Sequence, residues 1–245
     1  MQHLFDVVSE DTEFLVINKP AGLVCHPTKG DVYSSLISRA RLYLGTASTP
    51  HLINRLDRET SGIVIVAKTA EANSGLRKLW ESRAVRKEYL AIVHGELRRA
   101  QVIDVPLGAD EGSIVTIKDR VREDGAPSRT QVFPVRMFER AGVFYTLVRV
   151  ILFTGRKHQI RIHLSYLGHP IVGDKLYGGD EGLYLAFGKG ELDEDQRARL
   201  VTENQCLHAE LVSFEMFGTR RTYRAAPEDW FDRFVQTKRP AVASP

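Results

Sequence analysis

Four charged residues crowd a short loop that precedes an apolar segment. Arg55, Asp57, Arg58 and Glu59 fall within five positions, and the apolar segment 63–67 follows. An ionised carboxylate can act as a nucleophile or a general base, and a neighbouring guanidinium favours the ionised form. Most neighbouring Asp and Arg side chains, however, only form a salt-bridge cluster on the surface. From the loop alone, Asp57 is a candidate catalytic carboxylate with a structural alternative.

A second polar cluster lies at residues 155–163, with the sequence GRKHQIRIH. If this segment is a strand, alternate side chains point to opposite faces of the sheet. One face would carry Gln159, Arg161 and His163, and the other would carry His158, Ile160 and Ile162. The two histidines would then lie on opposite faces, which disfavours a metal site built from both.

Arg161 stands between two isoleucines, so it is a candidate for a partly buried charge. A buried charge needs a partner of opposite sign, and Asp57 could be that partner. The alternative is an exposed strand edge that carries basic residues.

Tyr89 lies within the strand-like and otherwise largely aliphatic segment 86–93. A tyrosine in such a place usually packs into the core with its hydroxyl group satisfied. The alternative is an aromatic face that stacks on a nucleobase, as in proteins that bind single-stranded RNA. The segment itself does not decide between them.

No motif for a metal or a cofactor stands out. The Gly-rich segment 173–179 lacks the Lys-Ser/Thr ending of a phosphate-binding loop and is not a dinucleotide fingerprint. The two cysteines, Cys25 and Cys206, are far apart and lack metal-ligand spacing. This usage argues for a reducing compartment and against a disulfide framework. We therefore expect neither a metal nor a cofactor.

The composition is that of a folded protein able to bind an acidic partner. The 245 residues are 43% hydrophobic and 27% charged, which is enough for a full core. The net charge is only +3, but basic residues gather at 77–87, 120–140 and 220–224. Such clusters allow a nucleic-acid partner, with a solvated surface as the alternative.

The chain shows no targeting or membrane segment. Its first residues, MQHLFDVVSEDTEF, lack the basic start and apolar run of a signal peptide. No apolar run approaches the roughly 18 residues that a membrane span needs. We expect a soluble, cytoplasmic protein.

The pattern of elements predicts an α+β domain dominated by antiparallel sheet. Strands are expected at 14–17, 63–67, 86–93, 129–136, 144–152 and 207–214, and helices at 34–44, 70–82 and 228–234. Thr69 is the expected N-cap of the second helix, and Ser61-Gly62 the expected turn into the strand at 63–67. Residues 155–164 are a further strand or a strand-to-helix junction. We expect one domain over 1–235 and a frayed tail at 236–245.

Five ordered motifs resemble those of the RluA-type pseudouridine synthases. They are VINKPAGLVCHPT (16–28), NRLDRETSGIVIVAKT (54–69), RKEYLAIVHG (86–95), TGRKHQIRIHLSYLGHPIVGDKLYGG (154–179) and LHAELVSF (207–214). The resemblance implies the pseudouridine synthase fold, a mixed and mainly antiparallel sheet flanked by helices and loops, with an active-site cleft across the sheet. It also implies an enzyme that isomerises uridine in ribosomal or transfer RNA to pseudouridine without a cofactor.

The resemblance implies a role for each matched residue. Asp57 matches the catalytic aspartate, and Arg161 matches the arginine that pairs with it. Tyr89 matches the tyrosine that stacks on the target base and has been considered as a base in the proton steps. Arg55 matches an arginine thought to assist entry of the flipped base, and Ile160 falls at an apolar site beside the uracil.

Two more residues of the motifs, Lys19 and His158, are expected to bind the substrate. One residue departs from the pattern, because Asn54 stands where the family usually has a histidine before Arg-Leu-Asp. Asparagine can donate and accept hydrogen bonds but lacks the ring area and the titration of imidazole. Since the first motif begins about 16 residues from Met1, we expect no S4-type RNA-binding domain. We also expect the protein to be a monomer.

Two alternatives come from other classes of protein. A non-catalytic RNA-binding module on the same fold would explain the basic clusters, but it would not need Asp57, Tyr89 and Arg161 together. A glycoside hydrolase needs two carboxylates that flank one bond, and Glu59 would have to be the second.

Overall fold

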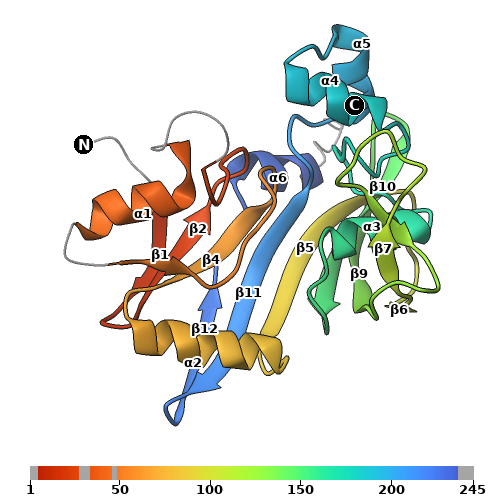
Figure 1. Ribbon diagram of the computed structural model, residues 1–245. Helices are drawn as coiled ribbons and strands as arrows, with labels where there is room; N and C mark the ends of the chain where they lie inside the picture. Colours follow the sequence, from red (N-terminus) through yellow and green to blue (C-terminus); the bar gives the residue numbers. More distant parts are fainter. Residues whose placement is uncertain (1–4, 28–33, 46–48, 237–245) are drawn as a thin grey trace, which may run out of the picture.

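The computed structural model describes residues 5–27, 34–45 and 49–236. Its main feature is a ten-stranded sheet in the order β1-β2-β4-β11-β5-β10-β9-β6, with β12 beside β11 and β3 beside β4 (Figure 1). Among the described strand pairs, only β4 and β11 run parallel, and the others are antiparallel. The prediction of an α+β fold with a mixed, mainly antiparallel sheet is therefore confirmed.

The strands of the large sheet are β1 (Asp6–Glu10), β2 (Phe14–Lys19), β3 (His51–Leu52), β4 (Ser61–Ala67), β5 (Arg86–His94), β6 (Gln101–Asp104), β9 (Arg129–Arg140), β10 (Val143–Leu152), β11 (Leu207–Met216) and β12 (Thr219–Arg224). A small separate sheet pairs β7 (Leu107–Ala109) with β8 (Asp119–Val121). The helices are α1 (Leu36–Leu44), α2 (Ala70–Glu81), α3 (Gln159–Tyr166), α4 (Gly182–Lys189), α5 (Glu194–Leu200) and α6 (Asp229–Val235).

Strand β4 is buried along its whole length because helices cover both of its faces. Val64 and Val66 pack into the cluster that contains α1, while Ile63 and Ile65 pack into the cluster that contains α2. A strand covered on both faces needs apolar side chains at successive positions, not at alternate ones. The unbroken run after the charged loop is thus explained by its place between two helices.

Ser61 and Gly62 are the first residues of β4, so the turn predicted there is wrong. Gly62 has a φ of +110°, and a Cβ at this position would lie 2.3 Å from the carbonyl oxygen of Ala209. Here β4 meets the parallel strand β11, whose His208 and Ala209 pair with Ser61 and Gly62. Only glycine tolerates both the backbone angle and the contact. The charged loop therefore ends where two strands approach each other closely.

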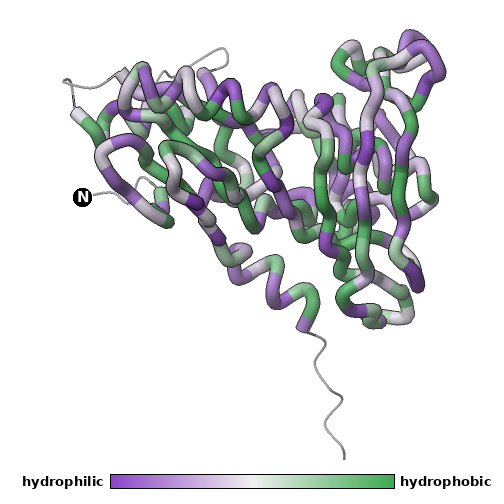
Figure 2. Tube along the Cα trace, turned by 90° about the horizontal axis from the view of Figure 1, so that it is seen from below, coloured by the Kyte–Doolittle hydropathy of each residue, from purple (hydrophilic) through white to green (hydrophobic). Residues whose placement is uncertain are grey.

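The other side of the sheet is built on β5, β10 and β9. Helix α3 packs one side into the core through Ile160 and Leu164, and Ile162 packs with Leu107 of the small sheet. Helix α6 is amphipathic, with hydrophobic and hydrophilic residues mixed along its length (Figure 2). Its Phe231 and neighbouring apolar residues join the same core.

The strand predicted for 155–164 is wrong, and the strand-to-helix alternative is right. Strand β10 ends at Leu152, a short loop follows, and helix α3 begins at Gln159. His158 adopts a left-handed backbone conformation with φ 54°, which turns the chain into the helix. Apolar residues at 160, 162 and 164 suggested alternation, but neighbouring elements cover α3 on more than one side, so its apolar residues need not follow a single stripe.

Other local predictions hold, apart from elements with weak patterns. Helix α2 has Thr69 as its N-cap, and the Thr69 hydroxyl accepts a hydrogen bond from the Ala72 amide at 3.1 Å. Strands β1 and β12 and helices α4 and α5 were not predicted. Strand β12 carries three arginines in TRRTYR, so its strand conformation depends on pairing with β11.

The predicted tail at 236–245 lies outside the described residues except for Gln236. Of the helices described, none combines the length and the apolar character that crossing a bilayer requires.

Candidate active site

A cavity of about 570 Å³ opens beside the charged loop. Its walls come from segments far apart in the sequence, namely residues 24–26, 53–58, 80, 87, 89, 152 and 155–158. The charged loop forms one wall, and the loop before α3 forms another. Tyr89 and Lys87 project from β5, a central strand of the sheet. The cleft expected across the sheet is present.

Arg161 joins two carboxylates at the edge of this cleft. Its Nη1 donates to Oδ2 of Asp57 at 2.8 Å. Its Nε and Nη2 donate to the two oxygens of Asp174 at 2.7 and 2.9 Å. The side chain of Asp57 is 35% exposed, whereas those of Arg161 and Asp174 are 6% and 0% exposed. Asp174 thus holds Arg161 from within the core, and Asp57 is exposed to the cleft.

The charges of Arg161 and Asp174 are maintained by their mutual contact. Burial alone would lower the pKa of Arg161, but Asp174 and Asp57 together raise it above its ordinary value. Burial alone would raise the pKa of Asp174, but Arg161 and the amides of Leu176 and Tyr177 bring it below its ordinary value. The bidentate geometry also fixes the plane of the guanidinium. Arg161 is therefore a permanently charged and rigid donor to Asp57.

His158 lies on the same side as Arg161, contrary to the opposite faces expected for a strand. In a helical segment, residues three apart are neighbours. Nε2 of His158 is 3.8 Å from Oδ1 of Asp57, and Nδ1 is 2.9 Å from the hydroxyl oxygen of Tyr177. Burial, and then the charge of Arg161, lower the pKa of His158 to about 4. A neutral imidazole therefore stands beside Asp57 at neutral pH.

Tyr89 lines the cleft from β5. Burial raises the pKa of its phenol above the ordinary range, and the charge of Asp57 raises it further. The side chain therefore offers a protonated hydroxyl and an aromatic ring. Such a ring can stack on a planar base.

Comparison with known proteins now adds the family. The profile of the RNA pseudouridylate synthases matches residues 13–166. The chain belongs to this family. A ribosomal large subunit pseudouridine synthase D of Xanthomonas campestris is 38% identical over 213 residues, which are 85% of this chain and 61% of that protein. An uncharacterized RNA pseudouridine synthase of Bacillus subtilis is 36% identical over 214 residues, which are 84% of this chain and 72% of that protein.

The solved structure of human RNA pseudouridylate synthase domain containing 4 shares the fold. It has a TM-score of 0.70 and 26% identity, with 92% of this chain and 90% of that chain covered. The resemblance to the RluA type is confirmed by the relatives named as synthase D. The chain spans 49% to 61% of the length of four relatives with this name.

Lys19 lies beneath the charged loop and does not line the cleft. Its ammonium group is buried and donates to the carbonyl oxygens of Pro20 and Leu23 at 2.8 Å each and of Arg58 at 3.1 Å. Burial lowers the pKa of Lys19 to about 8. These bonds tie the first motif to the loop, so in this structure Lys19 supports the site without touching the cleft.

Asn54 fixes the start of the same loop to β4. Its Nδ2 donates to the carbonyl oxygen of Ile63 at 3.0 Å, and its Oδ1 accepts from the amide of Ile65 at 2.9 Å. The side-chain amide of Asn54 thus forms two hydrogen bonds with β4 that a neighbouring strand would otherwise form. The residue that departs from the family pattern is buried and structural here, and it is not among the titratable groups of the site.

Glu59 is engaged by a residue other than Asp57 or Arg161. It pairs with the buried ammonium of Lys175, which also donates to the carbonyl oxygen of Glu203. Burial raises the pKa of Glu59, although Lys175 opposes the shift. Glu59 is therefore engaged elsewhere and does not form the pair of opposed carboxylates that a glycoside hydrolase needs.

The remaining predicted residues divide between the cleft and the core. Arg55 is exposed and lines the cleft. Ile160 is buried in the core cluster with Leu164 and does not line the cavity. No group of three or more potential metal-ligating side chains was found in the described part of the chain.

Sequence reasoning missed Asp174 and Tyr177. Both lie in the Gly-rich segment 173–179, at the end of the third matched motif, and neither was among the predicted site residues. Asp174 holds Arg161, and the Tyr177 ring lies 5.0 Å from the Arg161 guanidinium carbon while its hydroxyl contacts His158. The available signal was an acidic residue in a motif close to an arginine expected to be buried.

Proposed function

We propose that this chain isomerises uridine in RNA to pseudouridine and that Asp57 is the catalytic carboxylate. The observation that carries the proposal is the hydrogen bond from Arg161 to Asp57 at 2.8 Å, in a cleft that also contains Tyr89. Membership of the RNA pseudouridylate synthase family supports it. The three residues come from a loop, a helix and a central strand, and the fold brings them to one cavity.

The reaction needs little more than these groups. The bond between uracil N1 and the ribose breaks, the base turns, and a bond from carbon 5 to the same ribose carbon forms. A proton leaves carbon 5 and one is gained at N1, so atoms and electrons balance without an oxidant. Asp57 would attack the ribose or the base, or remove a ribose proton.

The neighbours of Asp57 are suited to this work. Arg161 holds the carboxylate in place, and the neutral His158 adds no second positive charge beside it. Tyr89 would stack on the uracil. Its raised pKa makes a phenolate base unfavourable, so donation from its hydroxyl is better supported than proton removal.

Ribosomal RNA is the proposed substrate, because relatives at 36–39% identity are named ribosomal large subunit pseudouridine synthase D. Transfer RNA is the second substrate to test. A paired or stacked uridine must be extruded into the cleft, at a cost of a few kcal/mol. Arg55 and Arg156 line the cleft, where they would contact phosphates.

The test compares wild type with Asp57→Asn on transcribed large-subunit ribosomal RNA and transfer RNA, with pseudouridine mapped at single-nucleotide resolution. We expect wild type to modify defined uridines, Asp57→Asn to modify none, and RNA affinity to be unchanged. Asp195→Asn, an exposed residue of α5, is the matched control and should behave as wild type. Full activity of Asp57→Asn would disprove the catalytic assignment. RNA binding by wild type with no pseudouridine in any RNA would favour the non-catalytic binding module.

A further inference from the structure

The side chain of Lys87 is largely buried, its ammonium group opens onto the cleft, and no described residue is its anionic partner. Three lysines are buried among the described residues, and Lys87 is 6% exposed. Lys19 donates to backbone carbonyl groups and Lys175 pairs with Glu59. Within the described ranges, the Lys87 ammonium makes neither an ion pair nor a hydrogen bond, and its recorded contact is the Trp80 ring. Buried charges are normally paired, so this one needs an explanation.

The ammonium group faces the cleft. Lys87 and Tyr89 are two residues apart on β5, and both line the cavity. Side chains two apart on a strand share a face and are separated by about 7 Å along it. The nitrogen lies 5.5 Å from the centroid of the Trp80 ring. A Cβ built on Gly155 would lie 3.8 Å from the same nitrogen, and glycine leaves that space open.

The electrostatics of this corner favour an incoming anion. Burial lowers the pKa of Lys87, and the charge of Arg83 lowers it further. A negative group beside the ammonium would offset both effects. Glu88, the adjacent carboxylate on the strand, is already engaged by Arg86. Among the described residues no carboxylate pairs with Lys87, so an anionic ligand in the cleft would supply the missing negative charge.

We propose that Lys87 binds a phosphate group of the RNA strand whose uridine lies against Tyr89. This inference rests on the proposed function and adds a contact to it. Tyr89 would take the base, and Lys87, on the same face of β5, would take a phosphate of the same or the adjacent nucleotide. A phosphate contact positions the strand without reading its sequence.

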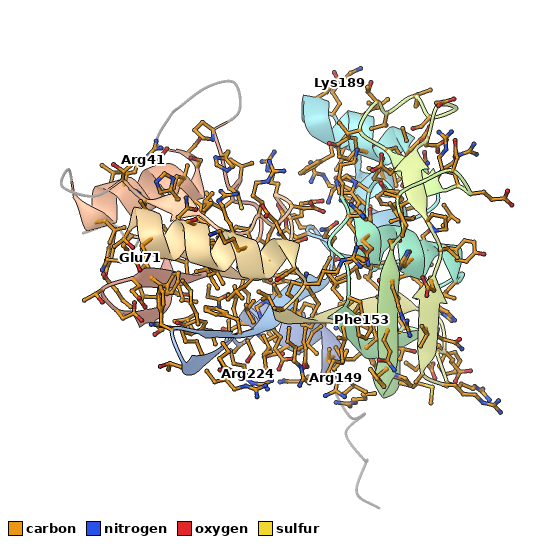
Figure 3. The ribbon with its side chains drawn as sticks, turned by 60° about the horizontal axis from the view of Figure 1, so that its bottom comes forward. Arg41, Glu71, Arg149, Phe153, Lys189 and Arg224 are labelled. Carbon is orange, nitrogen blue, oxygen red and sulfur yellow. The ribbon has the colours of Figure 1, made fainter. Side chains whose placement is uncertain are left out.

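The test measures the affinity for poly(U) between about 50 and about 200 mM salt in wild type, Lys87→Met, Lys87→Arg and Lys189→Met. Each phosphate contact to a single strand contributes about 0.7 to the slope of log affinity against log salt. We expect Lys87→Met to lower the slope by about 0.7 and Lys87→Arg to retain it. Lys189 lies exposed at the end of α4 (Figure 3), and its variant should retain the wild-type slope. An unchanged slope in Lys87→Met, or an equal loss in Lys189→Met, would overturn the inference.

Thermal unfolding separates binding from a structural role. Methionine has a similar length and no charge, so Lys87→Met relieves the burial of an unpaired ammonium. We expect its Tm to equal or exceed that of wild type while its RNA affinity falls. A lower Tm together with an unchanged salt slope would make Lys87 a structural residue.

The two proposals fail in different ways. Poly(U) binding requires no turnover, so the salt slopes stand even if wild type forms no pseudouridine. That result would overturn only the proposed reaction. If wild type is active and Lys87→Met has the same slope and the same KM, the phosphate contact alone is refuted.

Discussion

Arg161 makes contacts both in the core and at the candidate active site. It forms a bidentate pair with the fully buried Asp174 and donates its remaining nitrogen to Asp57. The first contact belongs to the core and the second to the cleft. If Asp57 is the catalytic carboxylate, as proposed, replacing Arg161 changes stability and catalysis together, and a single variant cannot separate them.

We predict that Arg161→Met is destabilised by about 3–5 kcal/mol, because Asp174 becomes a buried charge without a partner. The double variant Arg161→Met with Asp174→Asn should recover part of that stability, since no buried charge remains and the asparagine oxygen can still accept from the amides of Leu176 and Tyr177. Pseudouridine formation should stay strongly impaired in both. Urea denaturation and a turnover assay on the same samples check this. Recovery of turnover in the double variant would show that Arg161 acts only on stability.

Asn54 provides a second prediction at this scale. Asn54→Ala leaves the Ile63 carbonyl and the Ile65 amide without their side-chain partner, which should cost about 1–3 kcal/mol. Asn54→Asp can accept from Ile65 but cannot donate to Ile63, so at neutral pH it should be no more stable than the alanine variant. Urea denaturation gives both free energies. Wild-type stability in either variant would contradict the role of Asn54 as a backbone clamp.

Helix α3 is the element on which the site depends. It presents Arg161 toward Asp57, Ile160 toward the core and Ile162 toward the small sheet. His163 attaches it to the preceding strand region, with Nε2 2.9 Å from Ser128 Oγ and Nδ1 2.8 Å from Thr130 Oγ1. A bend of this helix would move Arg161 relative to Asp57.

The hydrogen bonds determine the neutral form of His163. Ser128 donates its proton to the carbonyl oxygen of Val105, so its oxygen accepts from Nε2 of His163. Thr130 accepts from Gln159 and therefore donates to Nδ1 of His163. A proton added to Nδ1 of His163 would point at the proton that Thr130 donates there, so the charged form of the ring is disfavoured. Burial lowers the pKa of His163 to about 4.

We predict acid destabilisation at His163. Between pH 6.5 and about 4 the unfolded chain takes up a proton that the folded protein does not. This group's contribution is thus fully present above pH 6.5. It falls by about 3 kcal/mol as the pH is lowered to about 4. His163→Gln keeps one donor and one acceptor but does not titrate, so its unfolding free energy should vary less with pH by that amount. Equal pH dependence of urea denaturation in the two proteins would contradict this.

At the scale of the whole molecule, position and pairing decide which basic residues can meet RNA. Arg221 pairs with Asp11 and Glu13, and Arg224 donates to Glu210 at 2.6 Å. Arg224 and Lys189 are labelled on opposite sides of the molecule in Figure 3. Arg55, in contrast, is exposed within the cleft. The cluster at 220–224 is thus largely balanced by acidic neighbours.

We predict that RNA affinity falls steeply with salt and that Arg55, not Arg224, contributes to this dependence. Arg55→Met should lower the slope of log affinity against log salt by about 0.7, the contribution of one phosphate contact to a single strand. Arg224→Met should leave the slope unchanged because its charge is already paired. Filter binding over a salt series measures both, and a flat response in wild type would exclude phosphate-dominated binding.

The sequence by itself determined the elements with strong local patterns, and it predicted which residue types meet in the candidate site. Hydrophobic periodicity and turn residues act over a few positions. They predict the strand at 63–67, the helix capped by Thr69 and the antiparallel pair 129–136 with 144–152. The need of a buried Arg161 for a carboxylate also followed from residue types, and the structure shows Asp57 to be one such partner.

Only the tertiary structure decided the rest, because burial and pairing depend on distant residues. Because the segment after His158 is a helix and not a strand, His158 lies on the same side as Arg161, beside Asp57. Arg161 also has a second partner, Asp174, which comes from a later segment of the chain. Lys19 was buried under the loop and Lys87 was left open to the cleft, although both are lysines in strands. Which lysine supports the site and which can bind a ligand depends on what the fold places around each ammonium group.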